Sequence, residues 1–492
     1  MISRRVLLAA ALGSPLLRAS QTDLQKAMES VEAAIPTAAA DPERPIYHFH
    51  PPANWNNDPN GTMFYRGWHH LFYQFNPYGP LWGHMHWGHA RSRDLVNWEH
   101  LPIALAPSED KGETAVFSGG AIFTRDGAPR LFYTSIGNRP PQQWMAIPAD
   151  DDLIVWNKSP RNPILTTAIH GARQISDWRD PFLFTENGAT YMVCGGNVSR
   201  QRYGGGGQVQ LYRAGNNELT EWKYLGPIFE CRDREIVNIE CPNLFKLDGK
   251  WVLIVSPQKP CQYFIGSLDV NRPKFTPEAY GVLDAGNDYA SNISTDPSGR
   301  TILWLWGRTD NPPSKGWNSV MALPRILSIG SDGFLRQQPA PEFEKLRGAQ
   351  VTARALPLKV APTVLRGVRG DCMELDVQVS MGNASAVRLD LRCSDAGKPG
   401  ASITINNEGL LSVGNSTMLL GKNERHRLRI FLDKRVFEVY ADDGMAALYS
   451  TVDAGPNDLN IATSAKGDGA ALPEVHAWPL KSAQFDLTRF KA

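Results

Sequence analysis

The chain has 492 residues, with 51 basic and 50 acidic side chains and a formal net charge of +1. Because no long run of one sign stands out, the composition argues against nucleic acid or an anionic membrane surface as a partner. The length predicts two domains, each large enough to bury its own core. Fourteen Trp, 43 Gly and 36 Pro favour many short strands and turns over long helices.

Residues 1–20 have the pattern of a signal peptide. Arg4 and Arg5 precede an apolar run that ends near Leu17, and small residues follow. The run is too short to span a bilayer, and no later segment is a candidate, so we expect no membrane insertion. The paired arginines resemble a twin-arginine export signal, with a Sec signal or a start that is not exported as the alternatives. We expect a bacterial protein exported to the periplasm or the extracellular space.

Residues 21–44 form a leader segment ahead of the first domain. Its apolar side chains recur at helical spacing until Pro36 and a run of alanines interrupt the pattern; they are Leu24, Met28, Val31 and Ile35. We expect a short helix or a mobile segment here.

Residues 45–338 have the texture of an all-β domain. Short apolar stretches alternate with Gly, Pro, Asn and Asp, and several are paired around Asn-Gly or Asp-Gly, as at 187–188 and 248–249. These dipeptides are strong hairpin signals. Repeated hairpins predict a sandwich, a barrel or a propeller.

The spacing of four polar residues favours the propeller. Asp58, Ser118, Asp180 and Glu240 are separated by 60, 62 and 60 residues, about the length of a four-stranded blade with generous loops. If each residue has the same place on successive blades, all four face one central funnel. Coincidence is the alternative, because the sequence has no clean internal repeat.

The remainder of the chain predicts a second β domain. A Gln-Gln-Pro-Ala-Pro stretch begins at residue 337, so we place a linker at 339–350. Apolar alternation with turns then predicts a β-sandwich over residues 351–492. It has few candidates for chemistry, and three roles stay open for it: bracing the first domain, contacting glycans or forming an oligomer interface.

The six cysteines are scattered and form no C-x-x-C motif. A buried free thiol is the simplest interpretation of each. Cys372 and Cys393 lie in the same downstream segment, and export would permit a disulfide between them without requiring one. Their redox state stays open.

Three acidic motifs carry the candidate chemistry. The stretch 55–61 reads Trp-Asn-Asn-Asp-Pro-Asn-Gly and on its own would be interpreted as a surface turn. Aromatic residues surround it, however, and the segments 178–181 and 240–242 also place one carboxylate near a proline. Three separated carboxylates among many aromatic rings are the components of a sugar-cleaving site.

These motifs resemble those of glycoside hydrolase family 32, which contains invertases, inulinases, levanases and other β-fructosidases. The segments that carry the resemblance are 55–61, 72–77, 82–90, 94–99, 117–120, 178–181, 240–242, 323–325, 428–433 and 436–440. The resemblance covers the chain from about residue 45 to the C-terminus. It implies an all-β fold, with a five-bladed β-propeller followed by a C-terminal β-sandwich.

The resemblance also implies roles for the three acids in a retaining cleavage of β-fructofuranosyl bonds. Asp58 would be the nucleophile, Glu240 the general acid and base, and Asp180 the transition-state stabiliser. Double displacement needs two carboxyl groups about 5–5.5 Å apart. The nucleophile must be ionised, so Asp58 needs polar neighbours, whereas the acid must hold a proton, so we expect a dry or negatively charged setting for Glu240.

Seven further residues are assigned to substrate binding. By the resemblance, the pocket for the terminal fructose is lined by Asn57, Gln74, Trp82, Phe117 and Ser118. Arg179 would anchor Asp180 or the sugar, and Trp306 completes the set. Core packing is the alternative for Trp82, and a structural ion pair is the alternative for Arg179. The segment 284–290 vaguely resembles a family motif that has an aromatic residue where this chain has Asp288, so it is left out of the site.

We expect no metal and no cofactor. His84, His86 and His89 are spaced closely enough to suggest zinc, but they lie inside a segment that the resemblance explains, and the mechanism needs no metal. Two positions depart from the family pattern, Asn56 where Met is frequent and Gly120 where Ser is frequent. Neither removes a carboxylate, so both affect specificity more than activity.

The predicted function is hydrolysis of sucrose or fructans, exo-acting and releasing fructose. A fructosyltransferase is the alternative in chemistry, since a sugar hydroxyl can replace water. A fructan-binding protein without activity is the alternative in class, although the presence of all three acids argues against it, and an arabinan-cleaving propeller is a third option. The sequence leaves open sucrose, inulin or levan, exo or endo attack, and the oligomeric state.

Overall fold

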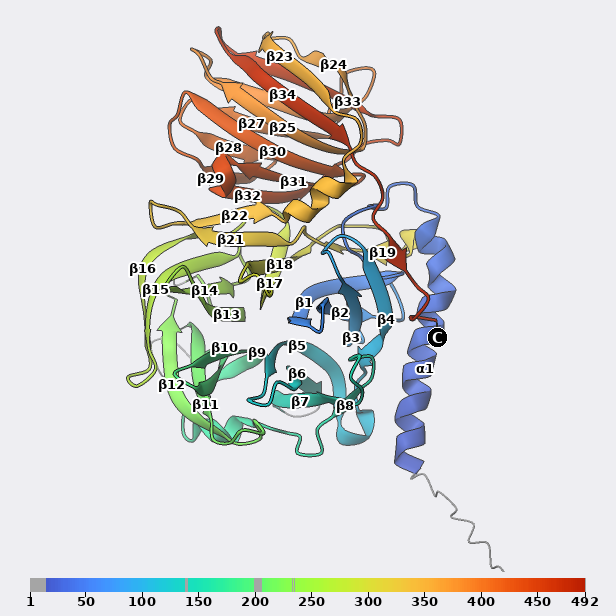
Figure 1. The fold of residues 1–492 in the computed structure, drawn as a ribbon, viewed down its shortest axis with the longest axis vertical. Coiled ribbons are helices and arrows are strands. Elements are labelled where there is room, and N and C mark those ends of the chain that lie inside the picture. The colour runs from blue at the N-terminus through green and yellow to red at the C-terminus, as the bar shows by residue number, and fades with distance from the viewer. Residues whose placement is uncertain (1–14, 138–139, 199–205, 232, 234, 492) are drawn as a thin grey trace, which may run out of the picture.

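The computed structural model describes residues 15–137, 140–198, 206–231, 233 and 235–491. Most of the predicted signal peptide, residues 1–14, lies outside the described residues. The described residues form two β bodies, one above the other in Figure 1, with the helix α1 (Pro15–Ala39) beside the lower body. No described helix combines the length and the apolar character needed to cross a bilayer.

The lower body contains five of the sheets of the described chain, each built on four antiparallel strands (Figure 1). Blade 1 consists of β1 (Asn54–Tyr65), β2 (Trp68–Asn76), β3 (His86–Ser92) and β4 (Trp98–Leu105). Blade 2 consists of β5 (Glu113–Phe123), β6 (Pro129–Gly137), β7 (Gln142–Pro148) and β8 (Trp156–Lys158). Blade 3 consists of β9 (Ser176–Glu186), β10 (Ala189–Asn197), β11 (Gly207–Ala214) and β12 (Trp222–Glu230). Blade 4 consists of β13 (Glu240–Leu247), β14 (Lys250–Ser256), β15 (Gln262–Asp269) and β16 (Lys274–Val282). Blade 5 consists of β17 (Asp288–Thr295), β18 (Thr301–Gly307), β21 (Arg325–Ile329) and β22 (Leu335–Pro339).

The first strand of each blade is innermost, and these strands contact one another in a ring: β1 to β5, β9, β13, β17 and back to β1. Two short strands extend blade 1 by pairing with it in parallel, one at each edge. They are β19 (Trp317–Asn318), which pairs with β1, and β35 (Phe485–Asp486), which pairs with β4. The short strand β20 (Val320–Met321) adds to blade 5. The predicted propeller is confirmed.

Two predicted hairpins illustrate how the sequence sets the blades. Asp248 and Gly249 join β13 to β14, and Asn187 and Gly188 join β9 to β10. All four residues have positive φ, between 47° and 80°. Two-residue turns that match the right-handed twist of the strands need positive φ at both positions, which Asn, Asp and Gly tolerate.

The upper body is the predicted β-sandwich, with two six-stranded sheets. One sheet has the order β23 (Val351–Pro357), β34 (Ala471–Pro479), β25 (Cys372–Ser380), β30 (Arg425–Asp433), β31 (Val436–Ala441) and β32 (Ala446–Thr451). The other has the order β24 (Thr363–Arg369), β33 (Asn460–Lys466), β26 (Ala386–Cys393), β27 (Ala401–Asn406), β28 (Leu410–Val413) and β29 (Ser416–Leu419). On β30, buried Leu428, Ile430 and Leu432 face the sandwich core. Alternation along the strand places Arg429 and Phe431 on the other face, where Phe431 is buried in the same core as propeller residues.

Short 3-10 helices lie in the connections between these elements. They are η1 (Glu109–Lys111), η2 (Thr167–His170), η3 (Pro313–Lys315), η4 (Pro341–Leu346) and η5 (Asp442–Gly444). The helix η4 lies within the predicted linker. Its Phe343 and Leu346 are buried in the same core as propeller residues, so this connection packs against the propeller.

The leader segment is more ordered than the sequence predicted. The helix α1 has 25 residues and continues through Pro36, where the sequence pattern indicated an interruption. Ala27, Val31 and Ala38 are fully buried in the propeller core, and Met28 packs against it. Burial of this apolar face stabilises the helix more than a proline in its last turn destabilises it.

The residues after α1 connect both bodies. Asp41 accepts hydrogen bonds from Lys315 and from the indole of Trp317, at 2.7 and 2.9 Å. The carboxylate of Asp433, in the sandwich, accepts the backbone N–H groups of Ile46 and of the next two residues at 2.8 to 2.9 Å. The sequence did not indicate these contacts, because they join segments 274 to 387 residues apart.

All six cysteines, each within the described residues, are free thiols. Cys372 is on β25 and Cys393 is on β26, in opposite sheets of the sandwich. The disulfide that the sequence left open between them is therefore not formed. Burial raises the pKa of both thiols, so they are protonated near neutral pH and unreactive.

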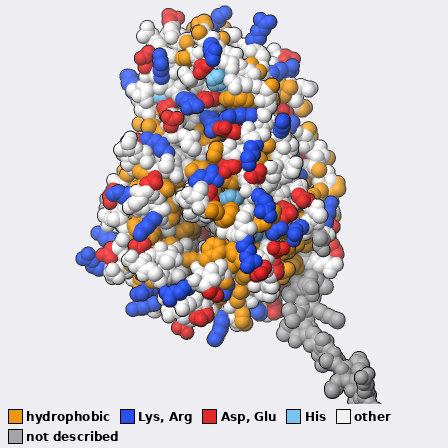
Figure 2. Space-filling model, viewed as in Figure 1, with side chains coloured by type: hydrophobic (Ala, Val, Ile, Leu, Met, Phe, Trp, Pro, Cys, Tyr) orange, Lys and Arg blue, Asp and Glu red, His pale blue; other side chains and the backbone are white. Residues whose placement is uncertain are grey.

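Charged side chains of both signs are intermixed over the face of the molecule in Figure 2. Some form exposed ion pairs, such as Lys250 with Glu278 at 2.7 Å. Pairs of this kind contribute little to stability because water and salt screen them. This face therefore has no extended field of a single sign that would attract a polyanion.

Candidate active site

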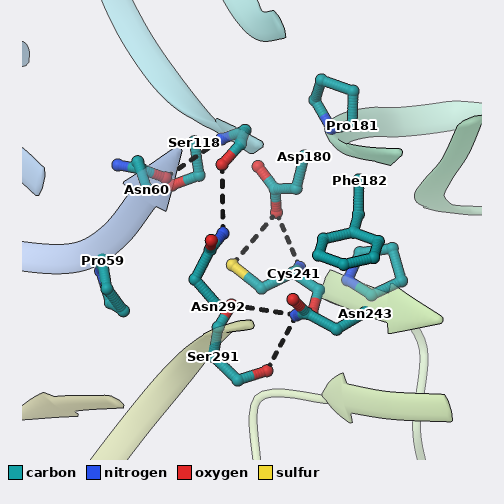
Figure 3. A pocket seen from close by; sticks show the side chains of 12 residues that line it. Pro59, Asn60, Ser118, Asp180, Pro181, Phe182, Cys241, Asn243, Ser291 and Asn292 are labelled. Atoms are coloured by element: carbon teal, nitrogen blue, oxygen red, sulfur yellow. Dashed lines mark hydrogen bonds between the residues drawn. The ribbon is translucent and has the colours of Figure 1, made fainter. Parts of the chain in front are cut away.

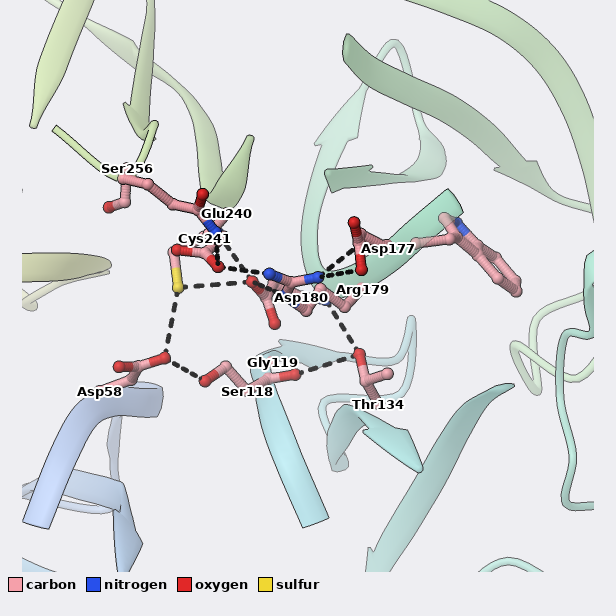
Figure 4. A network of polar contacts seen from close by, with 12 residues as sticks. Asp58, Ser118, Gly119, Thr134, Asp177, Arg179, Asp180, Glu240, Cys241 and Ser256 are labelled. Atoms are coloured by element: carbon pink, nitrogen blue, oxygen red, sulfur yellow. Dashed lines mark hydrogen bonds and ion pairs between the residues drawn. The ribbon is translucent and has the colours of Figure 1, made fainter. Parts of the chain in front are cut away.

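The candidate residues lie near the beginnings of the innermost strands. Asp58 is on β1, Ser118 on β5, Asp180 on β9 and Glu240 is the first residue of β13. Because the innermost strands form a ring, residues about 60 positions apart in the sequence come together at one end of the funnel (Figure 4). The spacing argument from the sequence is thereby explained.

A register shift interrupts each of these strands beside the site. The shifts fall between Asn56 and Pro59 in β1, between Val116 and Gly119 in β5, between Arg179 and Phe182 in β9, and between Glu240 and Asn243 in β13. A β-bulge leaves residues unpaired and re-aims their side chains. A proline follows Asp58, Asp180 and Cys241, and a bulge accommodates proline because it needs no N–H there.

Two bulge residues adopt the left-handed region without being glycine. Asp180 has φ of 63° and Cys241 has φ of 44°. Such conformations cost free energy and persist where the surrounding structure enforces them, often at functional sites. The backbone N–H of Cys241 donates to Asp180 Oδ2 at 2.9 Å. This hydrogen bond stabilises the conformations of the two strained residues.

Asp58 is surrounded by hydrogen-bond donors. Ser118 Oγ donates to its Oδ2 at 2.5 Å, and Asn57 Nδ2 donates to its Oδ1 at 3.1 Å. Gln74 joins these two, since its Nε2 donates to Ser118 and its Oε1 accepts from Asn57. Burial raises the pKa of Asp58, whereas the Ser118 and Asn57 donors oppose that rise. Three predicted substrate-binding residues thus orient this carboxylate.

Asp180 is 5% exposed and lies between the other two acids. Its backbone N–H donates to Thr134 Oγ at 2.9 Å. The thiol of Cys241 lies 3.6 Å from Asp180 Oδ2 and 3.5 Å from Asp58 Oδ2, and so bridges the two carboxylates (Figure 4). Burial raises the pKa of Asp180 to about 7, with Asp58 contributing to the rise and Arg179 opposing it.

Glu240 has donors on both oxygens. Arg179 Nη2 and Gln258 Nε2 donate to Oε1, the latter at 3.1 Å, and the Tyr289 hydroxyl donates to Oε2 at 2.5 Å. The sequence predicted a dry or negatively charged setting for this side chain. The structure instead surrounds it with a cation, a phenol and an amide, which come from strands and loops that the sequence could not place.

Arg179 links the acids of the site. Besides its contact with Glu240, its Nε lies 3.8 Å from Asp180 Oδ2, and its Nη1 lies 3.5 Å from Asp177 Oδ1. The predicted anchoring of Asp180 is therefore only one of its contacts. One guanidinium serves three carboxylates here, which leaves the cluster with an excess of negative charge when all are ionised.

Three of the predicted substrate-binding residues belong to two edge-on aromatic pairs. Trp82 is 60% exposed, so the core-packing alternative for it is wrong. Its ring meets that of Phe117 edge-on at 6.1 Å, whereas Trp306 meets Trp55 edge-on at 5.7 Å. Aromatic faces with polar groups between them suit a sugar, which has both apolar C–H faces and hydroxyls.

A small polar cavity, about the size of one water molecule, adjoins Asp180 (Figure 3). Amides from the innermost strands line it and tie those strands together. Asn292 Nδ2 donates to the Gly119 carbonyl at 3.2 Å, and Asn243 Nδ2 donates to the Cys241 carbonyl at 2.9 Å. These bonds fix the bulges on which the acids stand.

The histidines that suggested zinc do not converge. His86 Nδ1 lies 2.5 Å from the His84 carbonyl oxygen, whereas His89 Nε2 lies 3.0 Å from Nδ1 of His70. Within the described part of the chain, no three His, Cys, Asp or Glu side chains form a group that could hold a metal ion.

Sequence reasoning missed four residues that contact the acids: Thr134, Cys241, Gln258 and Tyr289. Cys241 was quoted in a motif without a role. Tyr289 lies in the segment 284–290, whose similarity to the family was set aside because of Asp288. Following that weak similarity would have found Tyr289, but no signal marked Thr134 or Gln258.

Comparison with known proteins identifies the family. Residues 48–339 match the Glycosyl hydrolases family 32 N-terminal domain, and residues 342–479 match the Glycosyl hydrolases family 32 C terminal domain. The chain belongs to glycoside hydrolase family 32. The resemblance seen in the sequence is confirmed, and the chain is a glycosidase.

Several relatives of this family 32 member are characterised. It is 30% identical to a sucrose-6-phosphate hydrolase of Bacillus subtilis over 480 residues, 90% of this chain and 96% of the relative. It is 30% identical to a Bacillus subtilis levanase over 511 residues, 92% of this chain and 72% of the relative. The crystal structure of fructan 1-exohydrolase IIa from Cichorium intybus has a TM-score of 0.81 at 25% identity, covering 91% of this chain and 99% of that one; a variant of it was solved in complex with 1-kestose.

Proposed function

We propose that the chain is a retaining β-fructosidase that removes terminal fructose from sucrose or fructans. One observation carries the proposal. Asp58, Asp180 and Glu240 come from three blades and form one connected cluster, in which Cys241 joins the first two and Arg179 joins the last two. The names of the relatives, sucrose-6-phosphate hydrolase and levanase among them, support a fructoside substrate.

The first step of the proposed reaction forms a bond to Asp58. Its carboxylate attacks the anomeric C2 of the fructosyl unit while the bond from C2 to the leaving oxygen breaks. Glu240 gives its proton to that oxygen, so the leaving group departs as a neutral alcohol. Ser118 and Asn57 hold Asp58 in position for the attack.

The second step releases the fructose. Glu240, now ionised, takes a proton from water as the water oxygen attacks C2, and Asp58 leaves as a carboxylate. Asp180 stabilises the positive charge that develops on the sugar in both transition states. Since burial and Asp58 raise the pKa of Asp180 to about 7, a proton can be shared among the acids near neutral pH.

We also propose that the protein is exported. The support is the sequence pattern of residues 1–20, with its paired arginines, short apolar run and small residues. Expression of the full chain in a bacterium, followed by fractionation and N-terminal sequencing, tests this. Cleavage near residue 20 in the periplasmic fraction supports it, and an intact N-terminus in the cytoplasm contradicts it.

A product assay tests the activity. Protein without residues 1–20 is incubated with sucrose, inulin or levan, and the sugars are resolved by anion-exchange chromatography. Free fructose from the native protein and from a control Asp126→Asn, but not from Asp58→Asn, supports the proposal. Asp126 is a suitable control because it contacts Thr124 in the β5–β6 turn.

The other outcomes separate the alternatives. Longer oligosaccharides from inulin or levan indicate endo attack, and growth of the sugar chain in concentrated sucrose indicates a fructosyltransferase. Absence of product from a folded protein contradicts the activity, and binding of levan without cleavage then supports a fructan-binding protein.

A further inference from the structure

Arg308 lies immediately after β18, beside the candidate site. Its guanidinium carbon is 4.6 Å from the centre of the Tyr289 ring and 5.2 Å from the centre of the Trp306 ring. The side chain is exposed. Among the described residues it has neither a side-chain hydrogen bond nor an ion pair, whereas Arg179 is engaged by carboxylates.

The rings beneath Arg308 are fixed. Tyr289 and Trp306 are directly paired across β17 and β18, so their side chains lie on the same face of the blade. The backbone N–H of Arg308 donates to the Asn287 carbonyl at 3.2 Å. The guanidinium therefore rests on an ordered aromatic platform rather than extending freely into water.

The platform places Arg308 on one side of Glu240. The Tyr289 hydroxyl donates to Glu240 Oε2, whereas Arg179 and Gln258 contact the other oxygen, Oε1. In the proposed reaction Glu240 protonates the oxygen of the departing group. The departing group must therefore lie next to Glu240, within reach of side chains that surround it.

We propose that Arg308 binds hydroxyl groups of the leaving-group sugar and so helps to determine which fructosides are cleaved. A guanidinium stacked on aromatic rings keeps its N–H donors at its edge, where they are free to form hydrogen bonds. Its planar fork can donate to two neighbouring hydroxyl oxygens at once. The inference rests on the proposed function, because it assumes that Glu240 is the acid.

Location, rather than stacking alone, supports this role. Arg93 is also exposed, and its guanidinium carbon lies 3.9 Å from the centre of the Trp68 ring. Trp68 begins β2, in blade 1, and the structure gives Arg93 no contact with an acid of the site. It is therefore a matched control that has the same type of ring contact without the neighbouring acid.

The test compares two leaving groups in native protein, Arg308→Gln and Arg93→Gln. Sucrose leaves a glucosyl unit with hydroxyls, whereas 4-nitrophenyl β-D-fructofuranoside leaves a phenol without them. We expect Arg308→Gln to lower kcat/KM for sucrose about tenfold, the effect of one hydrogen bond to a charged donor. We expect less than a twofold change with the aryl fructoside, and Arg93→Gln should match the native protein on both.

Sucrose 6-phosphate is the third substrate of the test, because several relatives are named for it. A loss confined to this substrate would overturn recognition of hydroxyls and indicate a phosphate contact instead. Equal losses on sucrose and the aryl fructoside would also overturn the inference, since Arg308 would then act on the fructosyl unit or the acids, which both reactions share. An unchanged kcat/KM on both substrates would overturn it as well. If native protein cleaves none of the three substrates, the proposed function itself fails, which the aryl fructoside distinguishes from failure of the inference.

Discussion

Two clusters of acids in this protein are each organised around one arginine. In the funnel, Arg179 contacts Glu240 and Asp180. Between the propeller and the sandwich, a single nitrogen of Arg325 lies 2.9 to 3.0 Å from carboxylate oxygens of Asp284, Asp288 and Glu438. The difference between the clusters lies in their exposure.

The interface cluster is closed. Arg325 and its three acids are fully buried, and a second cation completes the group: His48 lies 2.9 Å from Asp433 and 3.2 Å from Glu438. Burial alone would raise the pKa of Glu438, but Arg325 and His48 hold it at about 2. Burial raises the pKa of Asp284 and of Asp288 although Arg325 opposes the rise, so this cluster also has more carboxylates than cations. A buried network of this kind fixes one arrangement of two domains.

The funnel cluster is open. The side chain of Glu240 is 18% exposed and that of Arg179 is 17% exposed. Burial raises the pKa of Asp180 to about 7, with Asp58 adding to the rise and Arg179 opposing it. The comparison indicates that similar components stabilise the fold when they are sealed between two domains, and supply reactive carboxyl groups when they are partly exposed in a funnel.

The largest expected effect is the loss of activity when Glu240 of the open cluster is replaced. Glu240→Gln removes the general acid, and we expect kcat/KM for sucrose, which reports the bond-breaking first step, to fall about 10³-fold or more. The loss should be smaller for 4-nitrophenyl β-D-fructofuranoside, since its leaving group needs no proton. Steady-state kinetics on both substrates measures this, with Glu278→Gln as the control because Glu278 is on exposed β16. Equal losses on both substrates would contradict the role of Glu240 as an acid.

The next largest expected effect is the loss of stability when Arg325 of the closed cluster is replaced. Arg325→Met leaves Asp284, Asp288 and Glu438 buried without their shared cation, and we expect the free energy of unfolding to fall by about 3–5 kcal/mol. Denaturant titration measures it. Arg300→Met is the control, since Arg300 is 30% exposed in its ion pairs, and we expect a loss below about 1 kcal/mol there. Similar losses in the two variants would refute the comparison.

The closed cluster also predicts a pH dependence of stability. Burial alone would lower the pKa of His48, but Asp433 and Glu438 raise it to about 9, above its ordinary value of 6.5. A raised pKa of a cation stabilises the fold fully below pH 6.5, and the contribution disappears as pH rises through 9. We expect a loss of about 3 kcal/mol over this range. Unfolding measured from pH 6 to 10 should show it in native protein, and an unchanged slope in His48→Gln would contradict the assignment.

The smallest expected effect is a gain in stability when an acid of the open cluster is neutralised. The pKa of Asp180 is raised to about 7 from 3.8. Ionisation of this buried carboxyl therefore destabilises the fold, and the free energy of unfolding falls as pH rises from about 4 to 7. We expect Asp180→Asn to be inactive yet more stable than native protein at pH 8, by about 2 kcal/mol. Denaturant titration at pH 4 and pH 8 tests this. A variant that is less stable at pH 8 would show that Asp180 is structurally required.

The sequence predicted the parts of the site that follow from spacing. Asp58, Ser118, Asp180 and Glu240 recur at blade length, and the ring of innermost strands brings them together. It could not predict the bulges that re-aim these side chains, because a bulge depends on the pairing of neighbouring strands. The hydroxyl of Tyr289 reaches Glu240 only through the packing of blade 5 against blade 4.

The leader and the domain interface were predicted less well for the same reason. Pro36 interrupts a local helical pattern, but burial of the helix face against the propeller outweighs that local preference. Arg325 and Glu438 are 113 residues apart, and no periodicity links them. Long-range packing and charge pairing decide these features, whereas local alternation and turn residues decided the strands.

The most direct test of the account is to trap the fructosyl enzyme. Glu240→Gln protein is incubated with β-fructofuranosyl fluoride, whose leaving group needs no acid, and the digested protein is examined by mass spectrometry. The account predicts one fructosyl unit on the peptide that contains Asp58, because the variant lacks the base for the second step. A fructosyl unit on any other residue, or turnover to fructose of inverted configuration without an adduct, would contradict it.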